Sequence, residues 1–152
     1  MRNAIALFVF LLLVAIVATL GSLFPPGDWY AALQQPFFTP PNLVFPIAWT
    51  LLYLTMAFAA WRVWLRVGLD VAMGLWGAQL VANAAWSWIV FGRHALGWGL
   101  IDIVLLLVLI VVTMVAFFRR DRGAGWLMLP YLAWVGFATV LNAALWHLNP
   151  AG

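Results

Sequence analysis

Apolar segments of about 20 residues recur along nearly the whole chain, and very few charged side chains interrupt them. A helix needs about 20 apolar residues to cross the hydrocarbon core of a bilayer. Only 7% of the 152 residues are charged, against roughly a quarter in a soluble domain. We therefore predict an all-α integral membrane bundle of five transmembrane helices. Their expected ranges are about 4–24, 44–65, 71–91, 96–118 and 125–147.

The chain contains no linker, internal repeat or low-complexity tract, so we predict a single domain over residues 1–152. It contains no cysteine, which excludes disulfides and cysteine-based metal sites. The histidine and acidic residues do not have the spacing of metal ligands, so no metal site is expected. No basic patch with stacking aromatics lies outside the apolar segments, and we expect no nucleic-acid partner.

The arginines are distributed unequally between the two sides that five spans would create. Arg93 lies on one side, and the other six lie on the side of the N-terminus. These six are Arg2, Arg62, Arg66, Arg119, Arg120 and Arg122. The positive-inside rule then predicts a cytoplasmic N-terminus, with the first loop and the C-terminus outside. The arginine-only, short-tailed chain gives the impression of a bacterial inner-membrane protein.

The longest connection, residues 25–43, is rich in proline and aromatic residues. Proline fixes the backbone angle φ and limits the conformations of such a segment, whereas a flexible tether would be rich in glycine and serine. We predict that this first loop is a structured lid over the outer end of the bundle. The alternative is an aromatic belt at the membrane interface, which membrane proteins commonly have.

Polar and aromatic side chains recur at four-residue spacing in three of the predicted spans, which places them on shared helix faces. They are Trp49 and Tyr53, then Gln79, Asn83 and Ser87 with Trp86 beside them, and then Trp134, Ala138 and Asn142. The helical rise places most of them in the outer half of the bundle, beneath the first loop. Amides are costly in lipid unless paired. We predict a small-molecule pocket; the alternative, interhelical hydrogen bonding, is favoured for Gln79.

Residues for acid–base or nucleophilic catalysis are scarce. The chain has no glutamate, no lysine and no paired carboxylates, and its serines lack an adjacent base. Asp102 could carry a proton, or could simply extend toward Arg93. His94 and His147 could ligate a haem iron, although an exposed interfacial histidine is the commoner state. We expect no required cofactor.

Four groups of residues, in order along the chain, resemble the TspO/MBR family. This family includes the translocator proteins, also called peripheral-type benzodiazepine receptors, and the tryptophan-rich sensory proteins. The first group is Trp29-Tyr30-Ala31-Ala32-Leu33-Gln34-Gln35-Pro36 with Thr39-Pro40-Pro41, and the second is Phe45-Pro46-Ile47-Ala48-Trp49-Thr50 with Tyr53. The third is Gln79-Leu80, Asn83, Trp86-Ser87 and Phe91-Gly92-Arg93, and the fourth is Pro130-Tyr131-Leu132-Ala133-Trp134 with Ala138-Thr139 and Leu141-Asn142.

The resemblance implies a homodimer of five-helix bundles in which porphyrins, such as protoporphyrin IX or haem, and other flat hydrophobic ligands bind beneath the first loop. The implied function is tetrapyrrole sensing, trafficking or transport. The positions that the resemblance assigns to ligand contact are Tyr30, Trp49, Asn83, Trp86, Trp134 and Ala138. The shared helix faces add Tyr53, Ser87 and Asn142 to the predicted site.

Two other functions remain open. Some bacterial members of the family are reported to degrade protoporphyrin IX in light, and the tryptophans implicated would here be Trp49 and Trp134. The chain could instead be a structural or regulatory membrane subunit that recruits partners through its apolar fourth span. The sterol-recognition pattern of animal relatives is absent, because Ala143, Ala144 and His147 occupy that stretch.

Overall fold

The computed structural model describes residues 1–151, and within that range every regular element is a helix. The elements are α1 (Arg2–Ser22), α2 (Gly27–Ala32), α3 (Val44–Val67), α4 (Val71–Ser87), the π-helix η1 (Trp88–Gly92), α5 (Leu96–Phe118) and α6 (Arg122–Leu148). The predicted all-α class is confirmed. Four of these helices, α1, α3, α5 and α6, are long and apolar enough to cross a membrane.

The third predicted span is divided between two kinds of helix. α4 has only 17 residues, and η1 continues it with a further five. In η1 the N–H of Arg93 donates to the carbonyl of Trp88, five residues earlier, at 2.9 Å, which is the π-helical pattern. Residues 71–92 therefore form one continuous helical rod in which α4 alone is shorter than a membrane span.

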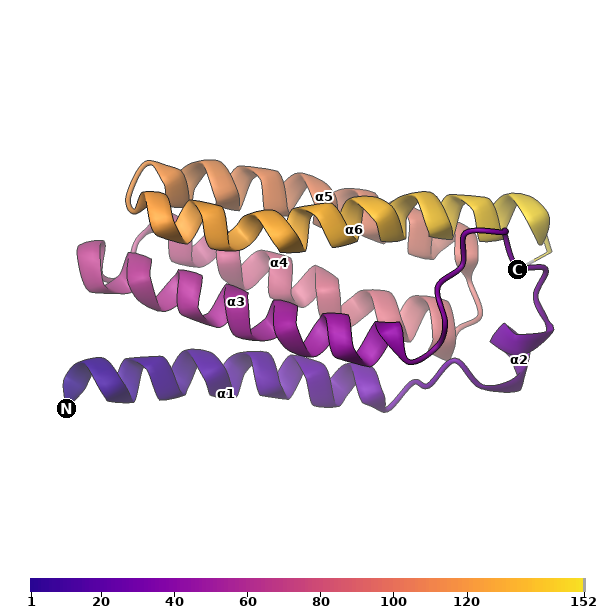
Figure 1. Cartoon of the computed structure of the whole chain (residues 1–152), viewed down its shortest axis with the longest axis horizontal. Helices are drawn as coiled ribbons and strands as arrows, with labels where there is room; N and C mark the ends of the chain where they lie inside the picture. Colours follow the sequence, from indigo (N-terminus) through magenta and orange to yellow (C-terminus); the bar gives the residue numbers. More distant parts are fainter. Residues whose placement is uncertain (152) are drawn as a thin grey trace.

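The long helices lie along a common axis (Figure 1). Their contacts form a closed ring of order α1–α3–α6–α5–α4. The interior is filled by side chains such as Met56, Phe117 and Tyr131, none of which is exposed. α1 contributes least, because only Phe10, Val14 and Val17 of this helix are buried. The outer surface of the ring is broadly apolar, which suits a lipid environment.

Two helices begin at aspartates that cap them. Asp70 Oδ1 accepts the N–H of Ala72 at 3.1 Å, and Asp121 Oδ1 accepts the N–H of Ala124 at 2.8 Å. Such caps satisfy N–H groups that have no partner inside the helix. The cap at Asp121 explains why α6 begins at Arg122, three residues before the predicted fifth span.

Asp121 also joins α3 to α6, because it lies 3.0 Å from nitrogens of both Arg62 and Arg66. Burial raises the pKa of its carboxyl group. The hydrogen bond from Ala124 and the two guanidinium groups lower this pKa by more than burial raises it, so the net pKa is below its usual value. A carboxylate whose pKa is lowered by folding stabilises the native state above its unfolded pKa, about 3.9. That contribution disappears as the pH falls through the folded pKa.

Asp121→Ala is therefore expected to lower the free energy of unfolding at pH 7 by about 1–2 kcal/mol, mostly through the lost cap. The difference between the wild type and this variant should shrink as the pH falls below about 4. Unfolding in one detergent at pH 7 and pH 3 measures both. Asp28→Asn, at an exposed position in the first loop, is the control, and a difference that does not change with pH would contradict the role of the carboxylate charge.

Candidate functional site

The first loop packs against the end of the bundle at which the chain terminates (Figure 1). Gln34 and Asn149 form a reciprocal pair: the Gln34 N–H donates to Asn149 Oδ1 at 2.9 Å, and Asn149 Nδ2 donates to the Gln34 carbonyl at 3.0 Å. The Trp29 ring stacks on His94, with centroids 4.3 Å apart and planes 4° from parallel. This contact places the His94 imidazole against the loop.

Tyr30 reaches from α2 toward η1. Its ring meets Phe91 edge to face at 5.6 Å, and Phe91 meets Trp86 in the same way at 5.4 Å. Burial raises the pKa of the Tyr30 hydroxyl. The three rings form a continuous aromatic contact from the loop into α4.

A buried chain of hydrogen bonds joins α3, α4 and α6. Tyr53 donates its hydroxyl to Asn83 Oδ1 at 2.8 Å. Asn83 Nδ2 donates to the Tyr131 hydroxyl at 2.8 Å, which donates in turn to Gln79 Oε1 at 2.7 Å. Both ends of the Asn83 amide are therefore bound within the protein. Gln79 makes the interhelical hydrogen bond that was favoured for it.

A second polar pair closes the bundle near the loop. Trp86 Nε1 donates to Asn142 Oδ1 at 3.0 Å, and Asn142 Nδ2 donates to the carbonyl of Leu96 at 2.9 Å. This pair links α4, α5 and α6. Ser87 lies on the side of α4 that faces α1. Its hydroxyl oxygen would be only 3.4 Å from a β-carbon added at Gly21 of α1.

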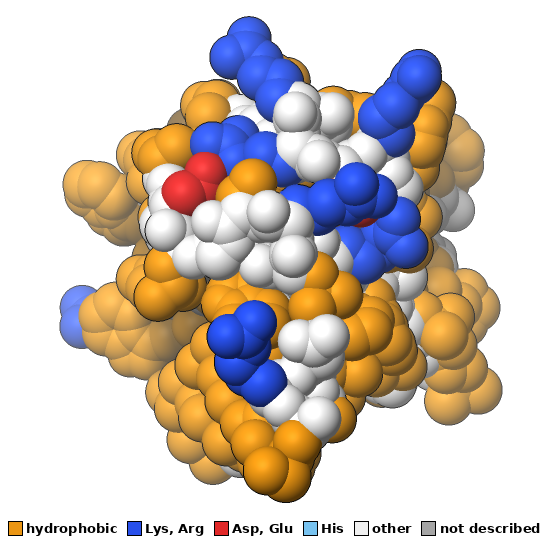
Figure 2. Space-filling view, turned by 90° about the vertical axis from the view of Figure 1, so that its left-hand side faces the viewer, with side chains coloured by type: hydrophobic (Ala, Val, Ile, Leu, Met, Phe, Trp, Pro, Cys, Tyr) orange, Lys and Arg blue, Asp and Glu red, His pale blue; other side chains and the backbone are white. Residues whose placement is uncertain are grey.

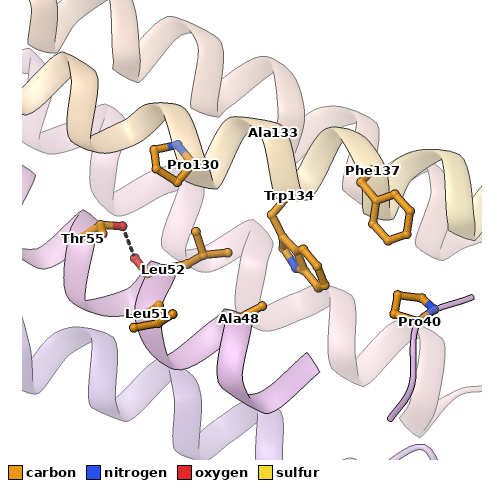
Figure 3. A pocket seen from close by; sticks show the side chains of 9 residues that line it. All are labelled: Pro40, Ala48, Leu51, Leu52, Thr55, Pro130, Ala133, Trp134 and Phe137. Atoms are coloured by element: carbon orange, nitrogen blue, oxygen red, sulfur yellow. Dashed lines mark hydrogen bonds between the residues drawn. The ribbon is translucent and has the colours of Figure 1, made fainter. Parts of the chain in front are cut away.

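An open cavity of about 560 Å³ lies instead between α3 and α6. Figure 3 shows side chains of both helices and of the first loop around it. The lining residues are Pro40, Ala48, Leu51, Leu52, Thr55, Pro130, Ala133, Trp134 and Phe137. The Thr55 hydroxyl is bound to the carbonyl of Leu52 at 2.9 Å, so the walls are almost entirely apolar. Leu51, Pro130 and Ala133 are exposed, which shows that the cavity opens sideways from the bundle.

Trp134 lines the cavity and carries an unpaired polar group. Its Nε1 atom is buried and has no hydrogen-bond partner within residues 1–151. The indole lies beside the rings of Phe45 and Phe137, with ring centroids 5.8 Å and 5.7 Å apart, respectively. Buried N–H groups are nearly always paired. An unpaired donor in an apolar cavity beside aromatic rings favours a ligand that combines a flat apolar body with a hydrogen-bond acceptor.

The predicted site residues are thus distributed over several environments. Trp134 lines the cavity. The Trp49 ring packs against the rings of Tyr53 and Tyr131, with centroids 5.6 Å and 6.3 Å apart. Tyr53 and Asn83 belong to the buried chain of hydrogen bonds, Trp86 and Asn142 form the second pair, and Ala138 is buried. Tyr30 lies on Phe91, and Ser87 faces α1. The structure does not bring all nine residues around one open space.

Most of the cavity walls were not among the predicted site residues. A signal for them exists, because residues 48, 51, 52 and 55 and residues 130, 133, 134 and 137 both follow the spacing of one helix face. In spans that are apolar on nearly every side, this spacing does not stand out. Tyr131, which organises the buried hydrogen bonds, was likewise not assigned to the site.

Comparison with known proteins agrees with the motifs. The sequence model of the TspO/MBR family matches residues 8–147. A tryptophan-rich sensory protein from Cereibacter sphaeroides is 40% identical over 132 residues, covering 87% of this chain and 84% of that protein. The tryptophan-rich protein TspO from Chlorobaculum tepidum is 41% identical, covering 86% of this chain and 87% of that protein. The human translocator protein is 38% identical, covering 85% of this chain and 81% of that protein.

Proposed function

Because the chain belongs to the TspO/MBR family, we propose that it is a membrane binding protein for porphyrins of the protoporphyrin IX type and for other flat hydrophobic molecules. It acts in tetrapyrrole sensing, trafficking or transport, and it functions as a homodimer. The observation that carries this proposal is the apolar cavity between α3 and α6, which is lined by Trp134, a residue whose indole N–H has no partner within residues 1–151.

The proposed topology has five spans, with α4 and η1 together forming the third. The start of α1, the end of α3 and the start of α6 lie at the same end of the bundle (Figure 1). Figure 2 shows arginine side chains gathered over that end. This distribution supports a cytoplasmic position for the N-terminus and an outside position for the first loop, in a bacterial inner membrane.

The cavity suits a porphyrin by size and chemistry. Its volume of about 560 Å³ lies within the range of about 300–1,000 Å³ of small-molecule sites. Trp134 and Phe137 offer flat surfaces for the macrocycle, and the indole N–H offers a donor for an acidic edge group. Since the amides of Asn83 and Asn142 are already bound within the protein, the polar contact proposed for the ligand is the Trp134 N–H, which has no partner within residues 1–151.

Trp134→Phe is expected to weaken protoporphyrin IX binding about three- to ten-fold, the value of one net hydrogen bond. Quenching of tryptophan fluorescence in the dark measures the affinity, and it should saturate in the wild type. Trp126→Phe, at an exposed position on α6 outside the cavity, is the matched control. Quenching that never saturates, or equal affinities of the two variants, would contradict the proposal.

The same titration under illumination distinguishes the enzymatic alternative. If the protein only binds the pigment, illumination leaves the spectrum of the bound pigment unchanged. Loss of pigment absorbance in light that requires both Trp49 and Trp134 would instead identify photo-oxidative degradation. Pigment loss that persists in the Trp49→Phe, Trp134→Phe double variant would come from free porphyrin and not from the protein.

A further inference from the structure

A second cavity, of about 390 Å³, lies between the start of α1 and the end of α3. Its lining residues are Arg2, Asn3, Trp64, Leu65 and Gly68. Trp61 Nε1 donates to the carbonyl of Asn3 at 2.9 Å, which ties α1 to α3 beside the cavity. The cavity is separate from the porphyrin site, because the two share no lining residue.

The charges at this end of the bundle leave the cavity positive. The two aspartates at this end of the bundle form ion pairs with arginines that do not line the cavity. Asp70 pairs with Arg120 at 2.6 Å, and Asp121 pairs with Arg62 and Arg66. Arg2 lines the cavity and makes no ion pair within the part of the chain that the structure describes. Figure 2 shows the basic side chains gathered over this end.

We propose that this cavity binds the headgroup of an anionic phospholipid. The Arg2 guanidinium and the Asn3 amide are donors for phosphate oxygens, and the Trp64 and Leu65 side chains cover the apolar part of the lipid next to the headgroup. Tryptophan is typical of this depth in a membrane protein. The cavity lies at the ends of two helices long enough to span a membrane, so phospholipid is the anion-bearing molecule in contact with it.

The lining also selects between lipid classes. No acidic side chain lines the cavity, so no carboxylate there pairs with the ammonium group of a zwitterionic lipid such as phosphatidylcholine. A net negative headgroup such as phosphatidylglycerol meets the unpaired guanidinium without an opposing cation. A soluble phosphate would satisfy Arg2 but would leave the apolar half of the cavity unused.

Native mass spectrometry of the full chain, after incubation with phosphatidylglycerol or phosphatidylcholine of the same acyl chains, tests this site. The wild type is expected to retain phosphatidylglycerol preferentially, and Arg2→Gln to weaken that retention about five-fold. Arg122→Gln is the matched control, because it removes the same charge at an exposed position of the same end, outside the cavity. Far-UV circular dichroism verifies that both variants remain folded.

Three outcomes would overturn the proposal. Equal retention of the two lipids would show that the cavity does not distinguish headgroups. Equal losses in Arg2→Gln and Arg122→Gln would show that only the overall charge of this end matters. Displacement of phosphatidylglycerol by millimolar inorganic phosphate would assign the site to a soluble anion.

Discussion

Ala133→Phe is expected to weaken protoporphyrin IX binding about 10- to 100-fold. Ala133 lies in the wall of the α3–α6 cavity and is exposed, so a phenyl ring there occupies space that the ligand needs. Forcing extra atoms into a filled site costs about 1–3 kcal/mol, which is about 5- to 150-fold in affinity and brackets the expected loss. The variant itself should fold normally, because its new side chain enters open space.

Ala78→Phe is the matched control for this experiment. Ala78 is exposed on α4 and does not line the cavity, so the same substitution there changes the lipid-facing surface without entering the site. Fluorescence titration of the two variants in parallel compares their affinities. If Ala133→Phe binds as tightly as Ala78→Phe, the ligand occupies another part of the bundle, such as the region around Asn83.

The helices could be predicted largely because proline, glycine and charged residues separate the apolar segments of the sequence. The predicted range 96–118 coincides with α5, and the predicted starts at 44 and 71 coincide with α3 and α4. α1 begins at Arg2, before the predicted start at 4, because a charged residue at a helix end does not have to enter lipid. The π-turns of η1 could not be predicted, since they arise from packing and not from residue type.

The site was harder to predict than the fold, because hydrogen-bond partners depend on tertiary contacts. Spacing correctly indicated that Asn83 and Asn142 point into the bundle, where both are buried. It could not show that Tyr53, Tyr131 and Trp86 satisfy these amides. A polar residue inside a span is therefore compatible with either a ligand contact or a structural one. Trp134 differs, since its N–H has no partner among the residues that the structure describes.

Gly99→Ala is expected to lower the free energy of unfolding by about 1–2 kcal/mol. Gly99 lies where α5 meets η1, and a β-carbon there would overlap Val90 Cγ2 and lie 3.3 Å from Asn142 Oδ1. Val90 is 2% exposed and β-branched, so its side chain has little freedom to turn away. Overpacking costs about 1–3 kcal/mol, more than the gain in helix propensity, at most about 1 kcal/mol, from replacing glycine.

Gly136→Ala adds the same methyl group at a helix-interior glycine, where the new carbon has no atom within 4 Å apart from its own residue, its chain neighbours and the backbone of its own helix. This control is expected to raise stability by about 0.5–1 kcal/mol, because glycine loses more backbone entropy on folding than alanine. The two variants should therefore shift the melting temperature in opposite directions in one detergent. Because Gly99 adjoins the Trp86–Asn142 hydrogen bond, Gly99→Ala should also change the near-UV circular dichroism of the tryptophans. A Gly99→Ala protein as stable as the wild type would mean that α5 and η1 can move apart at no cost in free energy. The close packing of these two helices would then not stabilise the bundle beneath the first loop.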